Sequence, residues 1–262
     1  MEKFVLDDLE IKRLKMIGEG SAGRVYLYND SALKYYHTAH LKRENYENKL
    51  AKLIELNKMN LDNYVLPKGL VYNKDDMFRG FTMNYQPSDI DMFDYLRSSE
   101  YTLDQKIEKI KKLEELIKKA HKLNMTLVDT NLWNFLVYGD EIKIIDTDTY
   151  KIGSLNHDFE PPFYCKYYKD KISTDIDPNL DKFSLGVHLL HLLSGGSFDN
   201  IFMIYYNTSF NYLYNYILLL DVDPIFKEFL FELVSDSKEK LYFDDNIDLL
   251  SSSNSFIKSK MW

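Results

Sequence analysis

The sequence is poor in cysteine, in long apolar runs and in positive charge. Its single cysteine, Cys165, excludes an intrachain disulfide, and such a chain is typical of a reducing compartment. The longest apolar runs, such as residues 217–220, are far too short to span a bilayer. Residues 1–8 are acidic and contain no apolar core, so no signal peptide is predicted there. We therefore expect a cytoplasmic protein without a membrane partner.

The charge balance argues against nucleic acid as a partner. With 41 acidic and 33 basic residues the net charge is −8, whereas contacts with phosphate backbones need clustered cations. Apolar residues make up 45% of the 262 residues, which is enough for a sizeable core. This length suits one large domain or two tightly joined lobes.

The order of strand-like and helix-like segments predicts an α+β fold with two lobes. Residues 11–36 are β-prone and interrupted by turns, which indicates an antiparallel meander. Residues 39–58 have helical spacing and predict one main helix, and short strand-like runs follow between residues 65 and 83. Residues 86–89 are predicted to be a linker. We therefore expect an N-terminal sheet lobe at residues 1–85 and a mostly helical lobe at residues 86–262.

The second lobe begins with a clear helix signal. Thr102 and Gln105 form a capping-box pattern before a long amphipathic helix. Residues 135–145 are predicted to form a hairpin with a turn at Gly139-Asp140. Residues 147–180 lack periodicity, and so long a loop inside a domain is usually functional. Helices are predicted to resume near Asp181 and to continue to about residue 250.

A triple-glycine pattern lies near the start of the chain, as Gly18-x-Gly20-x-x-Gly23-x-Val25. In a dinucleotide-binding fold the third glycine opens a helix, but here a β-prone run follows it. This context favours a glycine-rich hairpin whose backbone N–H groups approach phosphates. An ordinary glycine hairpin is the alternative if the pattern is taken alone.

Lys34 lies in an apolar strand, where an ammonium group needs a carboxylate or phosphate partner. The predicted helix that follows offers Glu44 and Glu47. Apolar residues follow Glu47 at packing offsets, namely Leu50, Ala51 and Ile54. Glu47 is therefore the preferred partner, and Glu44 remains open.

A third group of residues carries oxygen atoms. Asp129 and Asn134 lie five positions apart after a long helix, and Asp146 ends the next predicted hairpin. A loop that caps itself is the simplest alternative for the first pair. Carboxylate and amide oxygens suit Mg²⁺ bound together with substrate phosphates, and a further carboxylate can orient a hydroxyl and accept its proton. The combination predicts phosphoryl transfer.

Together these segments resemble the protein-kinase superfamily over residues 11–250. The resemblance implies ATP and Mg²⁺ as cofactors and a serine or threonine hydroxyl of an unknown protein substrate as acceptor. It implies that Lys34 contacts the α- and β-phosphates and pairs with Glu47. Asp129 would be the catalytic aspartate, and Asn134 and Asp146 would bind magnesium.

The resemblance also implies the remaining nucleotide contacts. Asn84 and Tyr85 would be the hinge that bonds to the adenine, and Leu136 would lie beneath it. Asp181 resembles the buried helix aspartate that braces the catalytic loop. The other residues implied at the nucleotide are Gly18, Gly20, Gly23, Val25 and Ala32.

Several positions depart from the family pattern. Leu127-Val128 replaces the usual His-Arg, so activation through a phosphorylated loop is not expected. Asn131 stands where serine/threonine kinases carry a lysine. Asp146-Thr147-Asp148 replaces Asp-Phe-Gly, so the segment is expected to flip less freely and Asp148 offers a third carboxylate at the metal.

Three functional hypotheses follow. An active, constitutive protein serine/threonine kinase is favoured, because the lysine, the catalytic aspartate and both metal ligands are present. A small-molecule kinase of the aminoglycoside or choline type shares the Asp-x4-Asn spacing but usually has a degenerate glycine loop. A nucleotide-binding pseudokinase scaffold gains support from the departures at Leu127, Val128, Asn131 and Asp148.

Overall fold

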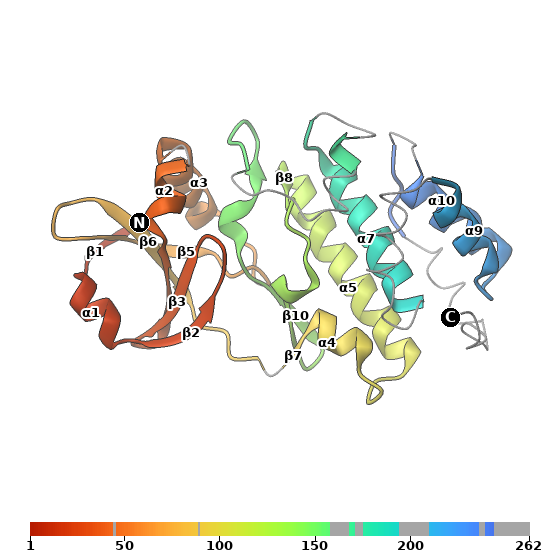
Figure 1. The fold of residues 1–262 in the computed structure, drawn as a ribbon, viewed down its shortest axis with the longest axis horizontal. Helices are drawn as coiled ribbons and strands as arrows, with labels where there is room; N and C mark the ends of the chain where they lie inside the picture. The colour runs from red at the N-terminus through yellow and green to blue at the C-terminus, as the bar shows by residue number, and fades with distance from the viewer. Residues whose placement is uncertain are drawn as a thin grey trace. The chain divides into compact units, whose positions relative to one another are not determined.

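The computed structural model describes residues 1–43, 46–88, 90–157, 168–170, 175–193, 210–235 and 239–243. Glu44 and Cys165 lie outside these residues, as do parts of the predicted loop 147–180 and of the predicted helical region after it. The fold is α+β, and the chain divides into two units (Figure 1). The first comprises Met1–Asp89 and Lys143–Asp158, and the second Ile90–Ile142 and Phe159–Trp262. The sequence predicts a single boundary between the lobes, after residue 85. In the structure the first unit also includes the later segment Lys143–Asp158.

The first unit is built on a six-stranded sheet with the order β1-β5-β6-β4-β3-β2. β1 pairs with β5 in parallel, and the other neighbours are antiparallel. The strands are β1 (Glu2–Val5), β2 (Lys15–Glu19), β3 (Gly23–Tyr28), β4 (Ser31–Tyr36), β5 (Pro67–Tyr72) and β6 (Phe78–Asn84). The later segment adds a 3₁₀ helix, η2 (Thr147–Thr149), and the short strand β11 (Lys151–Ile152).

The helices of the first unit differ from the sequence prediction in two places. α1 (Asp8–Arg13) takes in Ile11, where a strand is expected, because Asp7 and Glu10 form a capping box that starts a helix. The single helix expected at residues 39–58 is present as α2 (Thr38–Arg43) and α3 (Tyr46–Lys58).

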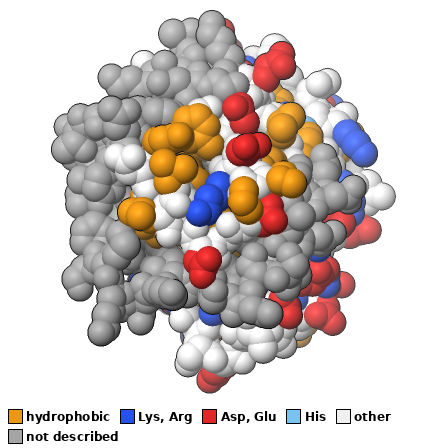
Figure 2. All heavy atoms as spheres, turned by 90° about the vertical axis from the view of Figure 1, so that its right-hand side faces the viewer, with side chains coloured by type: hydrophobic (Ala, Val, Ile, Leu, Met, Phe, Trp, Pro, Cys, Tyr) orange, Lys and Arg blue, Asp and Glu red, His pale blue; other side chains and the backbone are white. Residues whose placement is uncertain are grey.

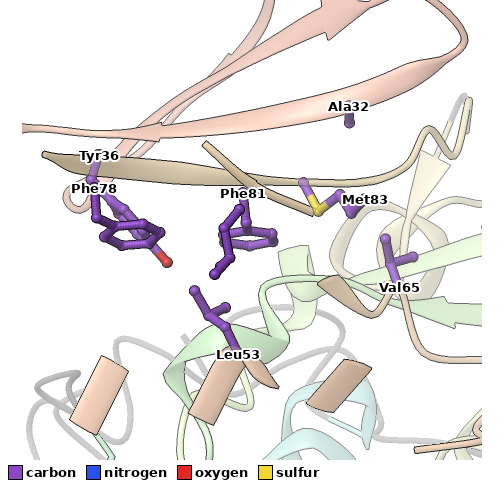
Figure 3. Packing of buried hydrophobic residues seen from close by; sticks show 8 residues of the cluster. Ala32, Tyr36, Leu53, Val65, Phe78, Phe81 and Met83 are labelled. Carbon is purple, nitrogen blue, oxygen red and sulfur yellow. The ribbon is translucent and has the colours of Figure 1, made fainter. Parts of the chain in front are cut away.

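Two apolar clusters cover the opposite faces of the sheet. Tyr36 belongs to a cluster with Leu53 of α3, and Figure 3 shows Leu53 pointing toward the side chains of the strands. Tyr35 faces the other way and packs with Ile11 of α1. Because strand side chains alternate between faces, Lys34 shares the α3 side with Tyr36. The strand pattern thus directs the lysine into the buried side of the sheet.

Two glycines permit the close approach of β4 to its neighbouring strands. A Cβ atom at Gly23 of β3 would collide with the backbone oxygen of Tyr35, and one at Gly80 of β6 would collide with that of Lys34. No side chain larger than hydrogen fits there without movement of the backbone. The strand that carries Lys34 is therefore held between two glycine positions.

The second unit is mostly helical. Its helices are α4 (Met92–Arg97), α5 (Leu103–Lys122), α7 (Pro178–Leu193), α9 (Phe210–Leu219) and α10 (Pro224–Val234). Its short elements are β7 (Ile90–Asp91), β8 (Met125–Thr126), the 3₁₀ helix η1 (Leu132–Asn134) and β9 (Phe135–Tyr138). β10 (Glu141–Ile144) follows β9, and both belong to a sheet with the order β10-β9-β7.

Two sequence predictions for this unit are confirmed. The capping box of Thr102 and Gln105 starts α5, which packs beside α7 (Figure 1). The hairpin of β9 and β10 has its turn at Gly139, whose φ is +53°. α7 begins at Pro178, three residues before the predicted start, because boundaries set by backbone capping are poorly marked in the sequence.

α9 and α10 form an apolar groove of about 670 Å³ on the surface of the second unit. Leu218 and Ile225 line it, and each has at least half of its surface exposed. Figure 2 shows hydrophobic side chains gathered on this face around a basic side chain, with acidic ones beside them. Among the described residues, no helix is long and apolar enough to cross a membrane.

Candidate active site

The glycine-rich segment forms the β2–β3 hairpin of the first unit. The Gly20 N–H donates to the Gly23 oxygen over 2.9 Å at the tip of this hairpin. Gly18 pairs with Val25, and Val25 in turn pairs with Lys34 on β4. A strand follows the third glycine, which argues against the dinucleotide-binding interpretation. The hairpin and the lysine strand are therefore direct neighbours, as the phosphate-binding interpretation requires.

Lys34 is buried, with 4% of its surface exposed, and its ammonium group is fully compensated by carboxylates. Its Nζ donates to Asp148 Oδ1 over 2.7 Å and lies 3.2 Å from Asp146 Oδ1. Both aspartates belong to the later segment of the first unit. The sequence predicts that the buried ammonium of Lys34 has an anionic partner. In the structure the partners are the carboxylates of Asp146 and Asp148.

Asp148 uses both carboxylate oxygens for bonds within the first unit. Oδ1 accepts from Lys34, whereas Oδ2 accepts from Lys49 Nζ over 2.8 Å and from the Tyr36 hydroxyl over 2.7 Å. The Lys49 ammonium also donates to the backbone oxygen of Asp148. Asp148 has no exposed surface. Its oxygens are thus committed to lysines and a phenol, which corrects the expectation that it adds a third carboxylate at the metal.

The charges of this cluster shift the pKa values of its members. Burial alone would lower the pKa of Lys34, but the charges of Asp146 and Asp148 outweigh it and raise that pKa above its usual range. Burial alone would raise the pKa of Asp148, but Lys34 and Lys49 outweigh it and hold that pKa well below its usual range. Lys34 is therefore cationic and Asp148 anionic at neutral pH.

The predicted partner of Lys34, Glu47, is in another place. Glu47 lies in the first turn of α3, is exposed and has no ion pair among the described residues. The buried positions of α3 are Lys49, Lys52, Leu53 and Leu56, which share one helical face. The residues used to prefer Glu47 are only partly buried (Leu50 and Ala51) or exposed (Ile54). The helix thus presents a lysine where a glutamate is expected.

Asp146 is the more accessible of the two aspartates, with 36% of its side chain exposed. Its backbone is left-handed, with a φ of +58°, a conformation that aspartate tolerates better than most residues. Its backbone oxygen accepts from the Thr149 hydroxyl over 2.9 Å, which fixes the turn into η2. The carboxylate of Asp146 therefore lies beside Lys34 and is partly accessible to a ligand.

The remaining residues predicted at the nucleotide, among them the adenine contacts Asn84, Tyr85 and Leu136, lie in both units. Ala32 is buried in β4, and Asn84 ends β6, where it pairs with Ser31. Tyr85 follows and is exposed. Leu136 lies in β9 of the second unit and is half-buried.

The loop around Asp129 belongs to the second unit. Asp129 is buried, and its Oδ1 accepts from Asn131 Nδ2 over 2.8 Å. Asn134 donates its side-chain N–H to the backbone oxygen of Asp129 over 3.2 Å. Asn131 therefore orients the carboxylate of Asp129. The bond from Asn134 links Asn134 to Asp129, the two residues of this loop that are predicted to be catalytic.

Helix α7 braces the loop before Asp129. Val128 has a φ of +66°, a conformation that is rare for a β-branched residue and costs about 1–3 kcal/mol. Asp181 accepts from the N–H groups of Leu127 and Val128 over 2.7 and 3.0 Å, and its Oδ2 lies 2.9 Å from His121 Nε2. This bracing by Asp181 is expected from the sequence, and it holds the strained turn in place.

The same helix contacts the loop on the other side of Asp129. His188 Nε2 lies 2.7 Å from the backbone oxygen of Thr130, so this nitrogen carries the proton and donates it. Burial lowers the pKa of His188 to about 3, which keeps the imidazole neutral. Asp181 and His188, seven positions apart on α7, thus bind the backbone on either side of Asp129.

Lys49, Tyr36 and His188 take part in these contacts, although they are not predicted as site residues from the sequence. A signal existed for Lys49, because it precedes Leu53 and Leu56 at helical offsets of four and seven. Tyr36 shares the parity of Lys34 on β4, which places both on one face. His188 lies in a helix that is apolar on all sides, so its spacing carries no directional signal.

The residues predicted to bind magnesium have donor atoms of the right chemistry. Asp146 offers a partly exposed carboxylate, and Asn134 uses its amide N–H groups, leaving an oxygen to which no described residue donates. Among the described residues there is no group of three or more His, Cys, Asp or Glu side chains suited to a metal. A site of this kind needs substrate phosphates to complete the coordination.

The sequence matches no protein-family model, and a comparison with curated proteins finds no significant match. Any assignment of function to this chain therefore depends on the geometry of the side chains within each unit.

Proposed function

We propose that this chain has a two-lobed, protein-kinase-like fold and transfers the γ-phosphoryl group of Mg-ATP to a serine or threonine hydroxyl of a protein. The observation that carries the proposal is the buried Lys34 beside Asp146, on the strand next to a glycine hairpin. A lysine kept cationic and fixed next to a partly exposed carboxylate suits a triphosphate with its metal ion. The braced loop around Asp129 supports the same proposal independently.

In this proposal each residue has a defined task. The backbone of the glycine hairpin and Lys34 bind the phosphates. Asn84, Tyr85 and Leu136 contact the adenine, and Ala32 lies at the nucleotide. Asn134 and Asp146 hold Mg²⁺, which offsets the charge of the phosphate oxygens when bound. The acceptor oxygen attacks the γ-phosphorus, the bond to the ADP oxygen breaks, and Asp129 orients the hydroxyl and accepts its proton.

Two alternatives remain specific enough to test. A kinase of small amino sugars or choline would use the same loop of Asp129 and Asn134 with another acceptor. A pseudokinase scaffold is favoured by Asn131, because its bond to Asp129 occupies one carboxylate oxygen without supplying a cation. The acceptor and the presence of turnover distinguish these functions.

The deciding experiment incubates the purified chain with γ-labelled Mg-ATP, alone, with a protein mixture, and with pools of amino sugars or choline. We expect label on protein serine or threonine, and a loss of at least about 100-fold in Asp129→Ala, since general base catalysis contributes about that much. Asp129→Ala should still bind Mg-ATP. Asp104→Ala, an exposed aspartate of the same unit, is the matched control.

Undiminished transfer by Asp129→Ala would contradict the proposal. Label found only on amino sugars or choline would move the function to the small-molecule kinases. Mg-ATP binding without transfer to any acceptor, including the chain itself, would favour the pseudokinase.

A further inference from the structure

Lys34 takes its carboxylate partner from the segment that carries Asp146, and helix α3 supplies a lysine instead. We infer that Asp148 is the positioning residue of Lys34, and that Lys49 ties helix α3 to the same carboxylate. The inference rests on the proposed function only where ATP is concerned, because the arrangement of these side chains is independent of any ligand.

The carboxylate of Asp148 joins three elements of the first unit. Lys34 and Tyr36 come from β4, Lys49 comes from α3, and Asp148 itself lies in η2. Lys34, Lys49 and Tyr36 are each at least nine-tenths buried. Charge-assisted bonds shielded from water are stronger than exposed ones, and loss of one partner leaves an uncompensated charge. The position of the Lys34 ammonium is therefore set mainly by this carboxylate.

The charge count of the cluster suits an anionic ligand. Lys34, Lys49 and Asp148 are buried and together carry one excess positive charge. Asp146 offsets this charge from 3.2 Å away, but its side chain is partly exposed. When Asp146 binds another cation, its carboxylate no longer offsets the excess positive charge at Lys34. Phosphate oxygens would then replace Asp146 as its second acceptor, while Asp148 keeps the lysine in place.

The carboxylate that positions Lys34 comes from the segment of Asp146 and not from α3. A glutamate on the helix would carry its carboxylate away whenever the helix moved. Here the carboxylate belongs to the segment of Asp146. Helix α3 bonds to Asp148 through Lys49, and to the backbone oxygen of Asn156 in the same segment through Asn48 and Lys52. The carboxylate that holds Lys34 thus comes from the same segment as Asp146, so no glutamate of α3 is needed to position the lysine.

The change in charge and the loss of positioning predict opposite effects of Asp148→Asn on the binding of ATP. Removal of a negative charge near a phosphate-binding lysine would by itself tighten the binding of ATP. Loss of the carboxylate that holds Lys34 weakens it. We expect the KM for ATP to rise at least about tenfold, corresponding to about 1.4 kcal/mol of binding energy. A KM for ATP that is unchanged or lower in a folded Asp148→Asn protein overturns the inference.

A double variant separates positioning from stability. Asp148→Asn removes the carboxylate that accepts from the buried Lys49 ammonium, so this variant should melt at a lower temperature. Asp148→Asn combined with Lys49→Met removes both charges and should regain most of the melting temperature while the KM for ATP stays raised. Recovery of the wild-type KM for ATP in the double variant would show that Asp148 only compensates Lys49. Glu55→Gln, an acid-to-amide change on the same helix, is the matched control.

Two further measurements complete the test. A rise in the KM for ATP with Glu47→Gln but not with Asp148→Asn would return the positioning role to the helix. Independently of ATP, the ¹H–¹⁵N signal of the Lys34 ammonium, assigned with Lys34→Met, should shift or vanish in Asp148→Asn and in the double variant. An unchanged signal overturns the inference. If the wild-type chain neither binds nor uses ATP, the proposed function fails, and the lysine signal still decides whether Asp148 holds Lys34.

Discussion

The three glycines of the β2–β3 hairpin are present for different physical reasons. At Gly23 a Cβ atom would collide with the backbone of β4, so the residue is required by the packing of the sheet. At Gly20 nothing lies within 4 Å of a built Cβ atom, so the structure leaves room for a side chain. Gly18 has only an ordinary contact with Val25. The sequence pattern does not distinguish these cases, because all three positions appear as the same letter.

This difference predicts that Gly23→Ala and Gly20→Ala affect separate properties. Gly23→Ala should lower the free energy of unfolding by about 1–3 kcal/mol, because the backbone must move to admit the methyl group. Gly20→Ala should change it by less than about 0.5 kcal/mol but should raise the KM for ATP if phosphates approach the hairpin backbone. Urea titrations and ATP kinetics on both variants measure this. Equal losses of stability would contradict the assigned clash at Gly23.

At the scale of single elements, the sequence predicts helices better than it predicts their buried faces. The capping box at Thr102 located α5, and the apolar strand around Lys34 predicted an ammonium group that needs an anionic partner. In α3 the apolar residues mark two adjacent faces, and the buried one carries Lys49 and Lys52. The offsets of four and seven place Lys49 on the face of Leu53 and Leu56, but they do not show that this face is the covered one. Its partner Asp148 lies about a hundred residues further along the chain, and the sequence around Lys49 does not indicate that ion pair.

Helix α7 yields a prediction on pH. His188 has a folded pKa of about 3 against an ordinary value of 6.5, so below pH 6.5 the unfolded chain binds a proton that the folded chain does not. Stability must therefore fall with decreasing pH, by about 2 kcal/mol from this group between pH 7 and pH 5. His188→Gln, which keeps an N–H donor for Thr130, should show a shallower loss. Urea titrations at both pH values test this, and an equal loss in both proteins would refute the role of His188.

At the scale of the whole chain, the predicted catalytic residues are divided between the two units. The first contains the glycine hairpin, Lys34 and Asp146, and the second contains Asp129 and Asn134. The sequence order of these residues was sufficient to propose phosphoryl transfer. It was insufficient to identify the partner of Lys34, because that depends on which carboxylate the fold delivers to a buried ammonium. Asn131 and Asp148 thus have defined partners, namely Asp129 for the former and Lys34 for the latter.

Binding of Mg-ATP should stabilise the folded chain by mass action. At a concentration one hundred times the Kd, a ligand that binds only the folded state adds about 2.7 kcal/mol, which for a chain of this size raises Tm by about 5 °C. Since Asp146 is the accessible carboxylate beside Lys34, Asp146→Asn should lose the part of this shift that depends on magnesium. Asp129→Asn should keep it, because its carboxylate is assigned to the acceptor hydroxyl and not to the metal. Thermal melts with ATP in magnesium or in chelator compare the two variants directly, and equal magnesium dependence in both would remove Asp146 from the metal-binding role.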